Sequence, residues 1–428
     1  MSGATAGRRP GSSALAALPP YPFAELERRA ATWRRGDQRA LDFSIGDPDL
    51  PPPAPVLEAA RAALAEPDGH RYSTSRGEPT LREAIARWMR LRFGVRVDPE
   101  REVAVLLGSK EGLAALPRAL LDPGEIVFVP DPGYPAYRNG GAGLAGCLPR
   151  PVPLRPEQGF RLDPDDLPPG GRLLYLNYPN NPTGATIERP ELRAIVDRAA
   201  ELDLWIAYDN AYSEVTFGGD RAPSLLEIPG ARERTVEFHS FSKTFGMAGW
   251  RLGFAVGAAD LVAPLVALKS QVDSGASRPL QRAAVAALDL YRGAERPPDV
   301  QRSVDEYARR MTRLVEGLRD RGYAVEAPRG TLYLWQRAPH DDAAGFAARL
   351  LADHGVLVTP GSAFGERGAA FVRWSVTNPL PVIEAALERL PRAPISGDGP
   401  RSATDDRSGV GVAAQADRRR SSSARTSG

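Results

Sequence analysis

Lysine is the rarer of the two strongly basic residues in this chain, which draws attention to the lysines that remain. Lysine and arginine together number 55 in the 428 residues, and only Lys110, Lys243 and Lys269 are lysines. An arginine side chain stays protonated in proteins, whereas the pKa of a lysine can fall until its amine is free to attack a carbonyl. A lysine retained here is therefore a candidate for chemistry that arginine cannot perform, and a chance surface lysine is the alternative.

Lys243 has the neighbours that such chemistry needs. The segment Thr235–His239 predicts a short buried strand, and Lys243 follows its carboxyl end, where open α/β sheets bind ligands. Ser240, Ser242 and Arg251 can converge on an anion, because a planar guanidinium suits phosphate. An amine beside an anion site is what pyridoxal phosphate requires. We therefore predict that Lys243 forms a Schiff base with this cofactor.

The same stretch carries a family signature. Ser240-Phe-Ser-Lys243 is followed by Gly246-Met-Ala-Gly-Trp-Arg251-Leu-Gly253. In these motifs the chain resembles the fold-type I pyridoxal phosphate aminotransferases of classes I and II, from about Leu41 to Leu390. The resemblance implies transfer of an amino group between an amino acid and a 2-oxo acid by a ping-pong mechanism. It also implies a homodimer with shared active sites.

A glycine-rich turn upstream is a second candidate for the phosphate. Val103–Leu107 predicts a strand, and the turn Gly108–Gly112 leads into a predicted helix over Leu113–Leu121. The first backbone N–H groups of a helix and its positive dipole end bind anions. Ser109 and Lys110 are therefore candidate cofactor-binding residues, although glycine-rich turns between strands and helices are common without a ligand.

Further polar residues follow other predicted strands. Asp209 ends the apolar run Leu204–Tyr208, and a carboxylate near the core needs a cationic partner, which the protonated pyridine nitrogen would supply. Asn181 and Tyr212 could both reach the phenolate oxygen of the cofactor. The resemblance places Tyr134 against the pyridine ring, with a purely structural tyrosine as the alternative.

The resemblance also indicates how substrate is held. It implies that Arg373 clamps the α-carboxylate, that the turn at Gly46 covers the substrate, and that Asn181 contacts it as well. Arginine geometry suits a bidentate carboxylate contact, although an arginine on a solvated strand face is the alternative. Tyr72 resembles a tyrosine that reaches into the partner subunit's site to touch the cofactor phosphate.

Composition argues against other classes of function. The formal net charge is +2, so a polyanionic partner such as nucleic acid is not indicated. The single cysteine, Cys147, excludes an intrachain disulfide framework, and the four histidines are too scattered for a metal site. No apolar run approaches the length of a membrane span, and the N-terminus is not a convincing secretory signal. These features predict a cytoplasmic protein without a metal.

Strands and helices alternate through residues 100–260, which predicts an α/β protein with a three-layer α/β/α arrangement around a mostly parallel sheet. We expect a large cofactor-binding domain at 51–286 and a smaller α+β domain formed by 21–50 and 287–393. In the smaller domain Gly322–Glu326, Thr331–Gln336, Gly355–Val358 and Ala370–Val376 are predicted strands. Residues 1–20 and 394–428 are predicted to be disordered.

Several segments, including Leu176–Gly184 and Lys269–Gly275, look most like LL-diaminopimelate aminotransferases and the related N-succinyldiaminopimelate enzymes. That would imply lysine biosynthesis with glutamate and 2-oxoglutarate as the other pair. Three alternatives stay open. They are another aminotransferase of the aspartate or alanine type, a C–S β-lyase on the same fold, and a transcriptional sensor with an aminotransferase-like domain.

Overall fold

The computed structural model describes residues 11–20, 22–219 and 221–393. The predicted disorder of residues 1–10 and 394–428 lies outside the described residues. Residues 11–20 include a one-turn helix, α1 (Ser13–Ala16). It is followed by α2 (Pro22–Thr32) and by the two-residue strands β1 (Arg34–Arg35) and β2 (Gln38–Arg39), which pair with each other.

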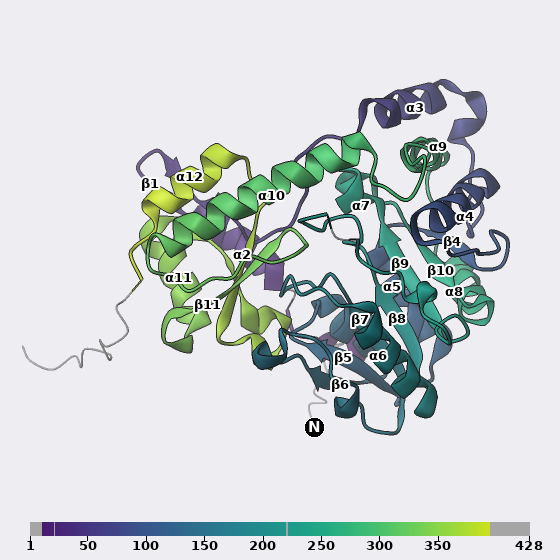
Figure 1. The fold of residues 1–428 in the computed structure, drawn as a ribbon, viewed down its shortest axis with the longest axis horizontal. Helices are drawn as coiled ribbons and strands as arrows, with labels where there is room; N and C mark the ends of the chain where they lie inside the picture. The colour runs from purple at the N-terminus through teal and green to yellow at the C-terminus, as the bar shows by residue number, and fades with distance from the viewer. Residues whose placement is uncertain (1–10, 21, 220, 394–428) are drawn as a thin grey trace, which may run out of the picture. The chain divides into compact units, whose positions relative to one another are not determined.

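A seven-stranded sheet forms the centre of the fold (Figure 1). All its strands except the edge strand β6 are mainly buried, because helices cover both faces of the sheet. In spatial order they are β4 (Val103–Leu106), β10 (Gly253–Gly257), β9 (Thr235–Ser240), β8 (Trp205–Asp209), β7 (Gly171–Asn177), β5 (Ile126–Asp131) and β6 (Leu148–Pro153). Only β10 runs antiparallel to its neighbours. The predicted, mostly parallel sheet is confirmed.

The alternation of side chains along these strands creates two apolar faces. One face carries Ala207 and Phe238 and packs against α5 (Ser109–Leu120) and α8 (Ala259–Val272). The opposite face packs against four other helices, which are α3 (Ala54–Ala65), α4 (Pro79–Phe93), α6 (Arg189–Glu201) and α9 (Arg278–Leu288). This is the predicted three-layer α/β/α arrangement.

A second, smaller sheet has the order β11 (Tyr333–Arg337), β14 (Phe371–Ser375) and β13 (Thr359–Pro360), all antiparallel. Nearby, β12 (Val356–Leu357) pairs in parallel with β3 (Leu41–Asp42). These strands pack with three helices, namely α10 (Pro298–Arg319), α11 (Ala343–His354) and α12 (Leu380–Arg389). The mixture of helices and antiparallel strands agrees with the predicted α+β character.

The predicted strand at Gly322–Glu326 is wrong. In the described chain this segment forms no strand, because it ends helix α10. Gly322 has a positive φ of 87°, and its N–H and that of Tyr323 donate to the carbonyls of Arg319 and Leu318. The last carbonyls of α10 therefore use the backbone donors that a strand would need.

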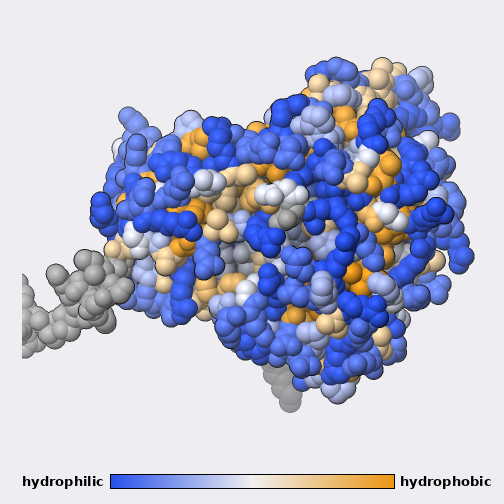
Figure 2. Space-filling model, in the orientation of Figure 1, coloured by the Kyte–Doolittle hydropathy of each residue, from blue (hydrophilic) through white to orange (hydrophobic). Residues whose placement is uncertain are grey.

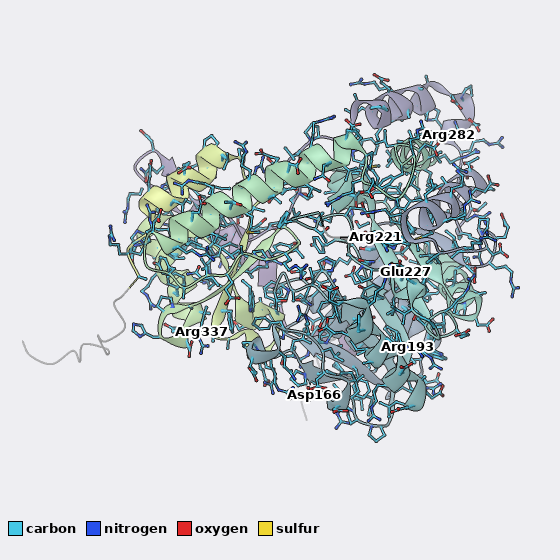
Figure 3. All side chains as sticks on the ribbon, in the orientation of Figure 1. Asp166, Arg193, Arg221, Glu227, Arg282 and Arg337 are labelled. Atoms are coloured by element: carbon cyan, nitrogen blue, oxygen red, sulfur yellow. The ribbon has the colours of Figure 1, made fainter. Side chains whose placement is uncertain are left out.

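Hydrophilic residues cover much of the face shown in Figure 2, and charged side chains such as Arg193 and Arg337 extend outwards (Figure 3). Arg193 pairs with Asp197 at 2.8 Å and Arg337 with Asp341 at 2.6 Å, and all four side chains are about half exposed. Exposed pairs of this kind contribute at most about 1 kcal/mol each. The fold is therefore held mainly by its buried apolar clusters.

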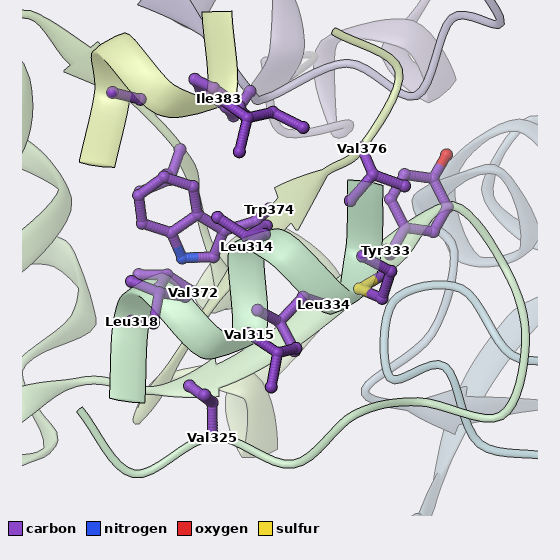
Figure 4. Close-up of a cluster of buried hydrophobic side chains, with 14 of the residues drawn as sticks. Leu314, Val315, Leu318, Val325, Tyr333, Leu334, Val372, Trp374, Val376 and Ile383 are labelled. Atoms are coloured by element: carbon purple, nitrogen blue, oxygen red, sulfur yellow. The ribbon is translucent and has the colours of Figure 1, made fainter. Parts of the chain in front are cut away.

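The cluster around the second sheet gives a test of that statement (Figure 4). Leu314 on α10 is fully buried there, whereas Leu148 on the edge strand β6 is 56% exposed. Leu314→Ala should lower the free energy of unfolding by about 2–5 kcal/mol, and Leu148→Ala by less than about 0.5 kcal/mol. Urea denaturation followed by circular dichroism measures both, and equal losses would contradict this account.

Candidate active site

A cavity of about 400 Å³ opens at the carboxyl ends of β7, β8 and β9, against the second sheet. Every residue that the sequence singled out for the site lines this cavity except Tyr72. Tyr72 is 87% exposed and lies outside the cavity wall. Register explains the convergence, because Asn177 pairs with Asp209 and Asp209 with Phe238, so three parallel strands end together.

Lys243 lies in α7 (Phe241–Thr244), one turn of helix that follows β9. Its Nζ donates to the carbonyl oxygen of Gly46 at 2.6 Å. Burial lowers the pKa of Lys243, and the cations Arg373 and Arg251 lower it further, against the opposing effect of Tyr333 and Asp47. The amine is therefore more easily deprotonated than an ordinary lysine, as attack on a carbonyl requires.

Asp209 lies at the floor of the cavity and is 5% exposed. Its Oδ2 accepts a hydrogen bond from the Tyr137 hydroxyl at 2.7 Å, and its Oδ1 accepts one from the Ala211 N–H at 3.3 Å. Burial raises the pKa of Asp209 from 3.8 to about 6, although the Tyr137 hydrogen bond and the nearby Lys243 oppose this rise. Among the described residues no cation lies within ion-pair distance of this carboxylate. The floor of the cavity can therefore accept a cationic ligand group.

The serines and Arg251 form a concave wall at the start of α5. Gly108 has a positive φ of 84°, and a Cβ there would lie 2.5 Å from Arg251 Nη2. A Cβ on Gly253 would lie 2.7 Å from the backbone nitrogen of Ser109. Glycine at these two positions therefore leaves a small space into which both the start of α5 and the Arg251 guanidinium point, so that one anion could contact both. Ser240 Oγ accepts from the Ser242 N–H at 3.2 Å and so fixes the adjoining turn.

Lys110 lines the cavity, but Lys269 does not. The buried Lys269 ammonium pairs with Glu111 at 3.2 Å and with Asp273 at 2.9 Å. Glu111 also accepts from the N–H of Leu107 at 3.1 Å, directly before the glycine turn. These ion pairs give Lys269 a structural role outside the cavity.

Arg373 enters the cavity from β14 of the second sheet and is 2% exposed. Its Nη1 donates to Asn181 Oδ1 at 2.8 Å and its Nη2 to the carbonyl of Ser44 at 2.5 Å. The guanidinium carbon lies 4.1 Å from the centre of the Tyr333 ring. These contacts fix the plane of the guanidinium, which sets the direction in which it could hold a carboxylate.

Two tyrosines of the site were not identified from the sequence. Tyr137 supports Asp209, and the hydroxyl of Tyr333 lies 2.9 Å from that of Tyr212. Tyr137 follows Tyr134 by three residues in the segment Tyr134–Tyr137, but no motif marks it. Tyr333 belongs to no motif. It reaches the cavity because β11 of the second sheet lies against the carboxyl ends of the central strands.

The fold and the cavity together define an α/β enzyme with a partly buried, easily deprotonated lysine at the edge of its sheet. A family model described as aminotransferase class I and II matches residues 38–390. The chain therefore belongs to the class I and II aminotransferases. It is a transaminase, and this family uses pyridoxal 5′-phosphate.

Relatives match nearly the whole length. The LL-diaminopimelate aminotransferase of Desulforudis audaxviator (strain MP104C) is 44% identical over 379 residues, which cover 87% of this chain and 95% of that protein. The enzyme of the same name from Aquifex aeolicus (strain VF5) is 41% identical over 384 residues, covering 89% and 98%. The solved N-succinyldiaminopimelate aminotransferase of Mycobacterium tuberculosis has a TM-score of 0.82 at 33% identity and covers 89% of this chain and 99% of its own.

In the part of the chain that the structure describes, no three histidine, cysteine or acidic side chains gather as metal ligands. None of the helices in the described ranges is both long and apolar enough to cross a bilayer.

The raised pKa of Asp209 predicts a stability cost in the protein without cofactor. Since the folded pKa of about 6 exceeds the ordinary 3.8, the protonated carboxyl favours the folded state at low pH, and that contribution is lost as pH rises through 6. Asp209→Asn should therefore stabilise the cofactor-free protein above pH 7, by about 3 kcal/mol at most.

Thermal melts between pH 4 and pH 8 measure this, with Asp166→Asn as a control of opposite sign. A hydrogen bond from Arg155 lowers the pKa of Asp166, so that substitution should destabilise the protein at pH 8. A difference between Asp209→Asn and the unaltered protein that does not change with pH would contradict the assignment.

Proposed function

We propose that this enzyme exchanges the amino group of LL-diaminopimelate with 2-oxoglutarate, as a step of lysine biosynthesis in the cytoplasm. The observation that carries the proposal is the likeness to two enzymes named LL-diaminopimelate aminotransferase at 44% and 41% identity over most of both chains. The N-succinyl form of the substrate is the nearest alternative, because a solved enzyme named for it matches at a TM-score of 0.82.

The phosphate of the cofactor would lie in the concave wall at the start of α5. Gly108 supports this placement, because a side chain there would fill the space beside Arg251. Backbone N–H groups at a helix start favour a phosphate, and Ser109, Lys110, Ser240 and Ser242 line the same cavity. Tyr72, which is exposed in this chain, would complete the phosphate contacts of a partner subunit in a homodimer.

The pyridine ring would lie between Tyr134 and Asp209. The buried carboxylate of Asp209 would hold the protonated ring nitrogen, and its lack of an ion-pair partner among the described residues supports this role. Asn181 and Tyr212 would donate to the phenolate oxygen. Asn181 Oδ1 accepts from Arg373, which leaves the amide Nδ2 to donate.

Pyridoxal phosphate, when bound, supplies an electron sink that makes the Cα hydrogen of an attached amino acid acidic. Lys243 Nζ would take that proton, and the lowered pKa of Lys243 favours the neutral amine that a base must be. Arg373 would hold the α-carboxylate so that the Cα hydrogen points at Nζ. The turn at Gly46 would cover the substrate and exclude water.

We propose the same division into domains that the sequence predicted, with residues 51–286 as the large domain and 21–50 with 287–393 as the small one. Separate apolar clusters support it. One cluster joins α10, α11 and α12 to the second sheet, and others join the helices to the seven-stranded sheet.

Replacing Lys243 tests the cofactor chemistry. Lys243→Arg keeps a cation but cannot lose its proton, so it should abolish the visible absorbance of bound cofactor and lower turnover at least about a thousandfold. Borohydride should fix a pyridoxyl group on the peptide that contains Lys243. The matched variant Lys269→Arg should keep both properties, because Lys269 makes ion pairs outside the cavity. Full turnover by Lys243→Arg would overturn the proposal.

A panel of amino donors tests the substrate. With 2-oxoglutarate as acceptor, kcat/KM for LL-diaminopimelate should exceed that for N-succinyl-LL-diaminopimelate, aspartate and alanine by at least about tenfold. Preference for any of the other three would reassign the substrate within the family. Release of pyruvate and ammonia from a cysteine conjugate at a higher rate than transamination would identify a β-lyase instead.

A further inference from the structure

Tyr333 lies in the cavity wall, and the proposed reaction assigns it no role of its own. It begins strand β11 of the second sheet, is 4% exposed and lines the same cavity as Lys243 and Asp209. No motif identified it. Its contacts nevertheless reach both the cofactor side and the substrate side of the proposed site.

The hydroxyl of Tyr333 contacts the cofactor side. It accepts a hydrogen bond from the hydroxyl of Tyr212 at 2.9 Å, and the two rings meet edge to face at 5.7 Å. Burial raises the pKa of Tyr212 well above 10, so this hydroxyl keeps its proton at neutral pH. Two hydroxyls that share one hydrogen bond fix each other's direction. Tyr333 therefore sets where Tyr212 can direct its own hydroxyl.

The ring of Tyr333 contacts the substrate side. The guanidinium carbon of Arg373 lies 4.1 Å from the centre of this ring and 4.6 Å from that of Phe364. A guanidinium stacked on aromatic faces is restricted to one plane. The ring of Tyr333 is therefore one of the surfaces that hold Arg373 in position for a bidentate contact.

The same hydroxyl also lies against the turn that contacts Lys243. A Cβ built on Gly46 would lie 2.1 Å from the Tyr333 hydroxyl oxygen, so glycine is the only residue that this contact admits. The Gly46 carbonyl in turn accepts from Lys243 Nζ at 2.6 Å. One tyrosine thus touches Tyr212, Arg373 and the turn that orients the amine.

We propose that Tyr333 is a positioning residue of this active site, in which the hydroxyl holds the Tyr212 oxygen in place and donates to it when Tyr212 gives its own proton to the cofactor, and the ring orients Arg373 towards the substrate carboxylate. The inference rests on the proposed function, because it assumes that Tyr212 and Arg373 have the roles given above. It makes two separable statements, one for the hydroxyl and one for the ring.

Tyr333→Phe tests the hydroxyl, because it keeps the ring. The readout is the pH titration of the visible absorbance of bound cofactor, which reports hydrogen bonding to the phenolate oxygen. Tyr333→Phe should move the midpoint in the same direction as Tyr212→Phe and by a smaller amount. The double variant should not move it beyond Tyr212→Phe alone, since the hydroxyl acts only through Tyr212.

Tyr333→Leu and Tyr333→Met test the ring, and either folded variant decides the outcome. The readout is the dissociation constant of 2-methyl-L-glutamate, an amino acid that cannot lose a Cα proton, measured from the change in visible absorbance. Loss of the ring should weaken its binding about tenfold or more, whereas Tyr333→Phe should stay within about twofold of the unaltered enzyme.

Tyr323→Phe is the matched control. Tyr323 is also buried, but its hydroxyl donates to the carbonyl of Pro391 outside the cavity, so both readouts should stay unchanged. If the unaltered enzyme lacks the visible band, the proposed function itself fails. If it has the band and Tyr333→Phe titrates like the unaltered enzyme while Tyr212→Phe does not, the hydroxyl role is overturned. Unchanged binding in the ring variants overturns the ring role.

Discussion

Removal of charged groups from water at the carboxyl ends of the parallel strands is the constraint on which this site depends. Strands β8 and β9 are almost wholly buried, so Asp209 and Lys243, which follow them, cannot be fully hydrated. One physical cause has opposite effects on the two groups, because burial always favours the neutral form. It raises the pKa of Asp209 and lowers that of Lys243. The fold therefore supplies a carboxylate that a cation would stabilise beside an amine that can lose its proton.

The second sheet completes the cavity through one short stretch of chain. The Ser375 N–H donates to the Phe43 carbonyl at 2.9 Å, and Thr359 Oγ1 donates to the Ser44 carbonyl at 3.0 Å. The same Ser44 carbonyl accepts from Arg373. This stretch leads directly to Gly46, whose carbonyl holds Lys243 Nζ. The guanidinium of Arg373, from the second sheet, and the amine of Lys243, from the central sheet, are therefore both positioned by backbone carbonyls of this one stretch.

The sequence predicted what short-range patterns determine. The strands of the central sheet read as apolar runs, and polar residues directly after them reached the cavity, as Asp209 and Asn181 did. The sequence could not predict contacts between distant segments. Tyr333 and Tyr137 belong to the site only because β11 and the turn after β5 fold against β8, and neither carries a local signal.

The boundaries of helices were also hard to predict from the sequence. The sequence pattern alone predicts one long helical region over Leu261–Tyr291, yet α8 ends at Val272 and α9 begins at Arg278. The Asp273 side chain accepts from the Gly275 N–H at 2.7 Å and stabilises the break. Helix α10 is not among the elements predicted from the sequence, although Val304, Met311 and Leu314 repeat at helical spacing and indicate a helix there.

The scarcity of lysine gains a structural meaning from these contacts. Lys243 and Lys110 line the cavity, and Lys269 reaches the glycine turn of the cavity wall through Glu111. Surface ion pairs, by contrast, use arginine, as Arg193 and Arg337 show (Figure 3). Arginine can replace lysine wherever a permanent charge suffices, but it can neither lose a proton nor place a compact ammonium between two partly buried carboxylates, as Lys269 does. Lys243 and Lys269 therefore lie where an amine that can lose its proton or a compact ammonium is needed, and both places adjoin one cavity.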